Sequence, residues 1–139
     1  MDYASFIAAV EQDAHIPRTR AEQAARATLA TLHERLAPRL AHHVAARLPD
    51  ELRPLLASET TAERFHSDEF VYRVARREGM TVAAAERDAR AVFAAIGQAV
   101  SPEELADVAS ELPADFQPLV VAAELASIAA RSDGARRTR

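Results

Sequence analysis

Apolar residues recur along this chain at the spacing of an amphipathic α-helix. The first stripe consists of Tyr3, Phe6, Ile7 and Val10, at positions i, i+3, i+4 and i+7 of one helical face. A second and longer stripe consists of Ala21, Ala25, Thr28, Leu29, Leu32 and Leu36. This periodicity predicts an all-α fold.

The same pattern occurs twice. Shifting the sequence by 64 residues aligns residues 2–56 with 66–120 without a gap and gives 15 identities. Alanine pairs carry little weight, because the chain contains 33 alanines. Three prolines also recur, and they are Pro38, Pro49 and Pro54, matched by Pro102, Pro113 and Pro118. We therefore predict two tandem homologous helical units of about four helices each, related by pseudo-two-fold symmetry.

Prolines and capping residues mark the expected helix limits. Pro38 and Pro102 would open the third helix of each copy, where the missing N–H costs nothing. Capping boxes are expected at residues 19–22 and 101–104, and Ser67 is a further expected N-cap.

These limits divide the chain. We predict helical repeat 1 at residues 1–57, a linker at 58–65 and helical repeat 2, with an extended last helix, at 66–131. Ser132, Asp133 and Gly134 would stop that helix, leaving a disordered basic tail at 132–139.

The expected last helix carries two apolar faces. One consists of Phe116, Leu119, Val120 and Ala123, and should pack on the core of the second copy. The other consists of Val121, Leu125 and Ile128, centred roughly 150° away at 100° per residue. We expect this second stripe to be an interaction surface that packs across the junction onto the first copy, with a homodimer interface as the next choice.

Composition supports helices and excludes several function classes. Alanine is the best helix former, and aromatic residues make up only 5% of the chain. The chain has no cysteine, which excludes thiolate chemistry and disulfides. A net charge of −4 gives no support for nucleic-acid or membrane binding, and no apolar run is long enough for a membrane span. We expect a cytoplasmic protein.

One polar unit is repeated. Glu22 stands four residues before Arg26, and Glu86 stands four residues before Arg90, which is the favourable order for a helical ion pair. A structural ion pair in each copy is the preferred interpretation, and a ligand or partner site is the alternative.

The five histidines form no ligand pattern. They are His15, His33, His42, His43 and His66. The neighbours His42 and His43 would point about 100° apart on a helix, so they are poorly placed to share one ion. With three glycines in the chain, a phosphate-binding loop is not expected either. We predict no catalytic residue, no metal site and no cofactor.

The second copy resembles a bacterial family catalogued as domain of unknown function 2267. The resemblance rests on Phe70 and Val74, Arg90-Ala91-Val92-Phe93, Ser101 and Glu104, and Leu112-Pro113 with Phe116. It covers about residues 1–120, although the first copy departs from the pattern at residues 37–40. The resemblance implies a helical tandem repeat in a bacterial protein, and it carries no activity over to this chain.

These observations favour a non-enzymatic helical protein-interaction or regulatory module. Its partner would be an unidentified protein, and the chain itself a monomer or a homodimer. The alternative is a small-molecule-binding or enzymatic helical protein with an apolar pocket between the repeats. An enclosed cavity would favour the alternative, and an exposed apolar patch would favour the interaction module.

Overall fold

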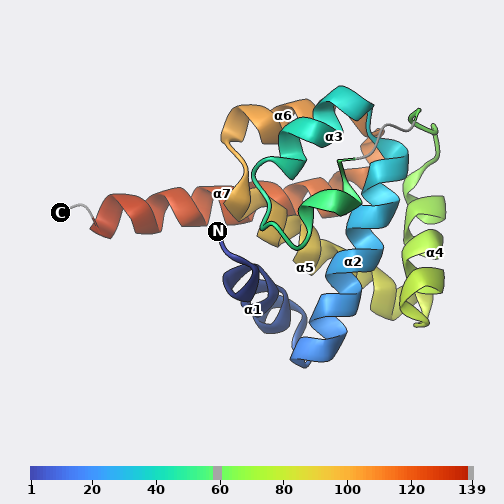
Figure 1. The fold of residues 1–139 in the computed structure, drawn as a ribbon, viewed down its shortest axis with the longest axis horizontal. Helices are drawn as coiled ribbons and strands as arrows, with labels where there is room; N and C mark the ends of the chain where they lie inside the picture. The colour runs from blue at the N-terminus through green and yellow to red at the C-terminus, as the bar shows by residue number, and fades with distance from the viewer. Residues whose placement is uncertain (58–60, 138–139) are drawn as a thin grey trace.

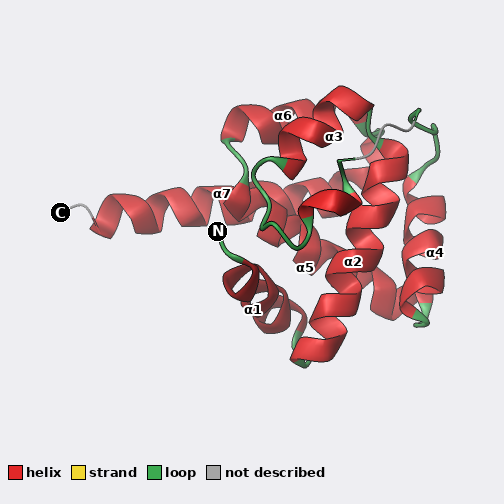
Figure 2. Ribbon diagram, viewed as in Figure 1, coloured by secondary structure: helices red, strands yellow, loops and turns green. Residues whose placement is uncertain are grey.

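The computed structural model describes residues 1–57 and 61–137, the last four of these as backbone only. The described chain is helical and contains no strand (Figures 1 and 2). Its elements are α1 (Tyr3–Ala14), α2 (Arg18–Arg35), α3 (Pro38–Ala45), the 3-10 helix η1 (Arg53–Leu55), α4 (Ser67–Glu78), α5 (Val82–Ala99), α6 (Pro102–Glu111), the 3-10 helix η2 (Ala114–Phe116) and α7 (Gln117–Arg137). The prediction of an all-α fold is confirmed.

Helix limits recur along the chain. Each of α4, α5 and α6 begins 64 positions after α1, α2 and α3 respectively, as from Tyr3 to Ser67. The ends of α1 and α4 correspond too, because His15 and Gly79 both adopt the left-handed conformation, with φ of 56° and 69°. The same 64-residue offset therefore relates helix starts and one type of helix end.

The first helix of each half packs against the other half of the protein. Helix α1 packs against α5 as well as α2, and α4 packs against α2 as well as α5. One continuous cluster of buried residues runs through both halves, and Phe6, Phe70 and Phe116 are its largest fully buried side chains. The halves thus share a single hydrophobic core.

The predicted stripes form this core. The predicted stripe from Ala21 to Leu36 and the first face of the last helix are buried. Phe6, Ile7 and Val10 of α1 are buried too, while Tyr3 is half-buried. The capping box at Ser101 and Glu104 is present, with each side chain bonded to the backbone of the other residue. The helical period therefore identified these buried faces correctly.

Two predicted N-caps are wrong. Helix α2 begins at Arg18 after Pro17, so Thr19 lies inside the helix and makes no capping box with Glu22. Helix α4 is preceded by His66, so Ser67 is its first helical residue rather than its cap. Pro17 has a fixed φ and occupies the cap position in an extended conformation, which starts α2 two residues earlier than expected.

Helix α7 is longer than predicted. It continues to Arg137 rather than ending near Ser132, so the expected disordered tail at 132–139 is helical up to that residue. A glycine inside a helix costs only about 1 kcal/mol relative to alanine, and Gly134 does not interrupt this one. Figure 1 shows the C-terminal part of α7 extending away from the other helices. In the first half, the element that corresponds to α7 is reduced to the 3-10 helix η1. Part of the expected linker, residues 58–60, lies outside the described residues.

Candidate functional site

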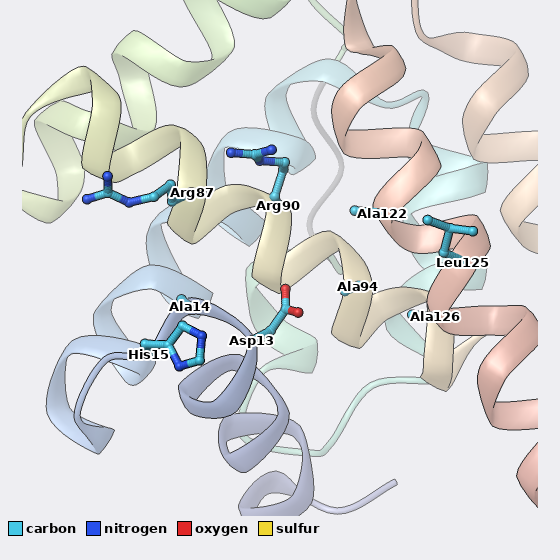
Figure 3. Close-up of a pocket in the computed structure, with 9 residues that line it drawn as sticks. All are labelled: Asp13, Ala14, His15, Arg87, Arg90, Ala94, Ala122, Leu125 and Ala126. Atoms are coloured by element: carbon cyan, nitrogen blue, oxygen red, sulfur yellow. The ribbon is translucent and has the colours of Figure 1, made fainter.

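A surface groove runs between α1 on one side and α5 and α7 on the other. We call it the α1–α7 groove, and its volume is about 550 Å³. Its lining residues are Asp13, Ala14, His15, Arg87, Arg90, Ala94, Ala122, Leu125 and Ala126 (Figure 3). A second hollow continues it toward Met1 and shares Asp13, Ala94 and Ala126 with it. The groove therefore joins residues from both halves of the sequence.

Alanines make the floor of this groove. Ala94 of α5 and Ala122 and Ala126 of α7 lie along it, and Ala8 and Ala9 of α1 line its continuation. Because an alanine side chain is a single methyl group, helices flanked by alanines leave a shallow apolar channel between their backbones. The high alanine content of the chain thus has a local structural consequence here.

Exposed apolar side chains follow helix α7 beside the groove, and we call this face of α7 its rim. Leu125, which lines the groove, is 62% exposed. Ile128, which lines neither hollow, is 53% exposed further along α7, while Val121 is half-buried. The expected packing of this stripe onto the first copy is therefore not found for Leu125 and Ile128. Helix α7 lies on α5 through its other face, and its far end extends beyond α1 (Figure 1).

Charged side chains stand at one end of the groove. Arg87 and Arg90 come from α5, and Asp13 and His15 from the end of α1 (Figure 3). His15 is held there by its left-handed backbone, with its N–H bonded to the carbonyl of Glu11. The groove thus combines an apolar floor with polar groups near one end.

The repeated Glu and Arg residues do not form the predicted pairs. Glu22 instead faces Arg18, at 3.8 Å between Nε and Oε1, and accepts a hydrogen bond from the Tyr3 hydroxyl. Burial and the bond to Glu22 raise the pKa of Tyr3. In the second half no ion pair joins Glu86 to Arg90 in the part of the chain that the structure describes, and both side chains are exposed. Arg90 borders the α1–α7 groove, whereas Glu86 lies on another surface.

A buried carboxylate pair is the main polar feature that the sequence did not reveal. Asp88 of α5 is 1% exposed and accepts a 2.9 Å bond from Arg20 of α2. Glu78, at the end of α4, is 9% exposed and lies against Asp88. Burial, followed by the bond and charge of Asp88, raises the pKa of Glu78 to about 8. Together with Arg20, the pair lies where α2, α4 and α5 meet.

Helix α4 is tied to α2 by a second polar cluster. The Arg73 guanidinium lies 4.0 Å from the centre of the Phe65 ring and also binds Glu34, Glu63 and Glu69. These carboxylates, Glu63 first, raise the pKa of Arg73. The cluster fixes the segment before α4 against α2, so its role is structural.

The histidines are dispersed. His66 pairs with Asp115 at 3.0 Å on the surface, while His42 and His43 are exposed on α3. Among residues with described side chains, no three potential ligands gather at one point to hold a metal ion. Within the same residues, no helix combines the length and apolar character needed to cross a membrane.

Comparison with known proteins identifies a family. A search among curated proteins gives no match to the chain. The family described as "Uncharacterized conserved protein (DUF2267)" matches residues 3–119, which include α1 through the first residues of α7. The match agrees with the resemblance carried by the second copy's motifs. The chain therefore belongs to the DUF2267 family.

Proposed function

We propose that this protein is a non-enzymatic interaction module whose docking surface is the α1–α7 groove with its exposed rim. The observation that carries the proposal is the exposure of Leu125 and Ile128 on a helix that extends beyond the rest of the fold. Burying an aliphatic side chain of this kind contributes about 1.5–3 kcal/mol, so a partner that covers both gains substantially. We place the module in the bacterial cytoplasm, as the family resemblance implies.

The shape of the groove favours a helical partner segment. Its floor consists of small side chains, and helices form its walls. Apolar side chains at i, i+3 and i+4 of an amphipathic helix would fit such a channel. Leu125 would cover one side of the inserted helix, and Asp13 and Arg90 would contact its polar edge. The partner is therefore a protein with an exposed amphipathic helix.

A small-molecule site is the second candidate. Arg87, Arg90 and His15 together could bind an anionic group at one end of the groove, and its lining comes from both halves. The interaction module is preferred because the groove is open along its length and its apolar rim is exposed rather than enclosed.

Duplication of one ancestral unit explains how the groove arises. We propose that the halves are copies related by an approximate two-fold axis, supported by the 64-residue offset of six helix starts and by the reciprocal packing of α1 on α5 and α4 on α2. The long α7 then breaks this symmetry, and the exposed rim belongs to that addition.

Site-specific photo-cross-linking tests the proposed function. A photoreactive amino acid is placed at Leu125 or Ile128, with Tyr72 as a matched control, since Tyr72 is a large exposed side chain on α4. We expect protein adducts in host cells from the two α7 positions and none from position 72. Absence of protein adducts at α7, combined with a ligand-induced rise in melting temperature that Arg90→Ala abolishes, would favour the small-molecule site instead.

A further inference from the structure

We propose that the α7 rim binds a second copy of this chain, with the two α7 helices packed antiparallel about a two-fold axis. This inference rests on the proposed function and names its partner. It starts from the exposed face of α7, whose apolar members are Leu125 and Ile128. A protein with such a face on an extended helix has an identical face available at equal concentration in every other copy.

The spacing on this face is that of a coiled-coil seam. Val121, Leu125, Ile128 and Ser132 follow one another at intervals of four, three and four residues. These intervals are the alternating a and d positions of a heptad, which keep one stripe facing a partner helix. Helix α7 continues without interruption through this stretch, so the seam is intact.

Charges beside the seam select the antiparallel direction. Glu124 and Arg131 are both exposed and stand seven residues apart, at equivalent heptad positions next to Leu125 and Ser132. They are about 10 Å apart along their own helix, too far to pair within one chain. In an antiparallel pair that stacks Leu125 on the partner's Ile128, Glu124 meets the partner's Arg131, and two-fold symmetry makes this ion pair twice.

Parallel packing would lose these contacts. It would set Glu124 near an alanine position of the other helix instead of a base, because parallel coiled coils pair the two flanks of the seam differently. The core layer would also stack Leu125 on its own equivalent. The charges of two α7 helices are therefore complementary only when the helices run antiparallel. This pattern fits another copy of α7 as the binding partner.

The expected interface is small. Two exposed aliphatic side chains per chain and the adjoining alanine-lined surface place it at the lower end of specific interfaces. We therefore expect a dimer that dissociates on dilution, with a dissociation constant of about micromolar order. It would form without rearrangement of the core, since the contacting residues are already at the surface.

Sedimentation equilibrium of the full chain tests the proposal over a wide concentration range. We expect the wild type to dimerise and Leu125→Asp to be monomeric with an unchanged melting temperature, because the side chain is exposed in the single chain. Tyr72→Asp, the matched surface control, should dimerise like the wild type.

Charge reversal tests the direction of packing. Glu124→Arg and Arg131→Glu should each weaken the dimer by about tenfold or more, because each creates two repulsive pairs. The double variant Glu124→Arg/Arg131→Glu should restore dimerisation. Failure of the double variant to recover, after both single variants weaken the dimer, would overturn the antiparallel arrangement.

The remaining outcomes separate this inference from the proposed function. A wild type that stays monomeric at the highest concentration, or a dimer that Leu125→Asp leaves intact, would overturn self-association through α7. If photo-cross-linking at Leu125 then still yields adducts with a different protein, the interaction module stands and only its partner was wrong. If neither a dimer nor an adduct forms, both proposals fail.

Discussion

Gly97 of α5 lies directly against the backbone of Ala123 of α7. A Cβ atom added at Gly97 would come to 2.1 Å from the Ala123 carbonyl oxygen, far inside any normal contact. The two helices form the most extensive helix pair of the described chain, and this close approach lies within it. The position 64 residues earlier is His33, so the first half could not accept a helix in the same way.

Gly97→Ala should therefore destabilise the protein. Helix propensity alone would stabilise it by about 1 kcal/mol, whereas the clash with Ala123 should cost about 1–3 kcal/mol beyond that gain. Denaturant unfolding monitored by circular dichroism shows directly whether the free energy of unfolding falls or rises. The exposed neighbour Gln98→Ala is the control and should stay within about 0.5 kcal/mol of the wild type. A stabilised Gly97→Ala would contradict the close packing.

The buried Glu78 should make stability depend on pH. The unfolded chain releases this proton near the ordinary pKa of 4.5, whereas the folded protein retains it up to about 8. The folded state therefore binds more protons in this window, and the free energy of unfolding should fall as pH rises from about 4.5 to about 8. Neither oxygen of Glu78 has a hydrogen-bond donor among the described side chains, so its contact with Asp88 requires that proton.

Glu78→Gln should remove this dependence, because the amide donates to Asp88 without a titratable proton. We expect the variant to match the wild type near pH 5 and to exceed its stability by about 1–3 kcal/mol near pH 9. Urea unfolding at a series of pH values measures both. The exposed Glu86→Gln should keep the wild-type slope, and an equal slope for Glu78→Gln would refute the buried proton.

Arg73→Ala should loosen the segment before α4. It removes the ion pairs to Glu34 and Glu63 and the contact with Phe65, for a loss of about 1–3 kcal/mol. Hydrogen exchange provides a local readout, because the Glu63 amide donates to the Glu34 carbonyl at 2.8 Å and should exchange faster. Arg76→Ala, which removes an exposed guanidinium from the same helix, should change neither quantity.

The buried faces were predictable because they depend on local periodicity. Phe6, Leu29 and Phe116 stand in stripes that the 3.6-residue period identifies without knowledge of the partner helices. The start of α6 was also predictable, since Pro102 and the Ser101 box act within one turn. Features that depend only on residues of a single helix can therefore be predicted from the sequence.

Features that depend on two helices could not be derived this way. Glu78 and Asp88 look like ordinary surface acids in sequence, and only the packing of α4 on α2 and α5 buries them beside Arg20. Likewise Glu22 has an arginine four residues before it and another four residues after it on α2. The structure pairs it with Arg18 rather than Arg26, and tertiary packing brings the Tyr3 hydroxyl to it. The groove requires three helices at once, and no single stripe in the sequence identifies it.

The two halves should not fold independently, despite their repeated sequence. Helix α1 packs on α5 and α4 packs on α2, so each half contains helices whose buried faces are covered by the other half. Separation would expose Phe6 on one side and Phe70 on the other, both fully buried in the intact protein. Each such loss costs several kcal/mol, which is comparable to the whole stability of a domain this small.

A protease site inserted at residues 58–60 tests this without altering the helices on either side. The cleaved chain should stay assembled, with the helical signal of the intact protein, and should separate only in denaturant. The purified pieces should each lack a cooperative melting transition and should regain one on mixing, with a melting temperature that rises with concentration. A chain with the same insertion left uncut controls for the insertion itself. A cooperative transition in either isolated piece would mean that the shared core is not required, and that the repeats are independent domains.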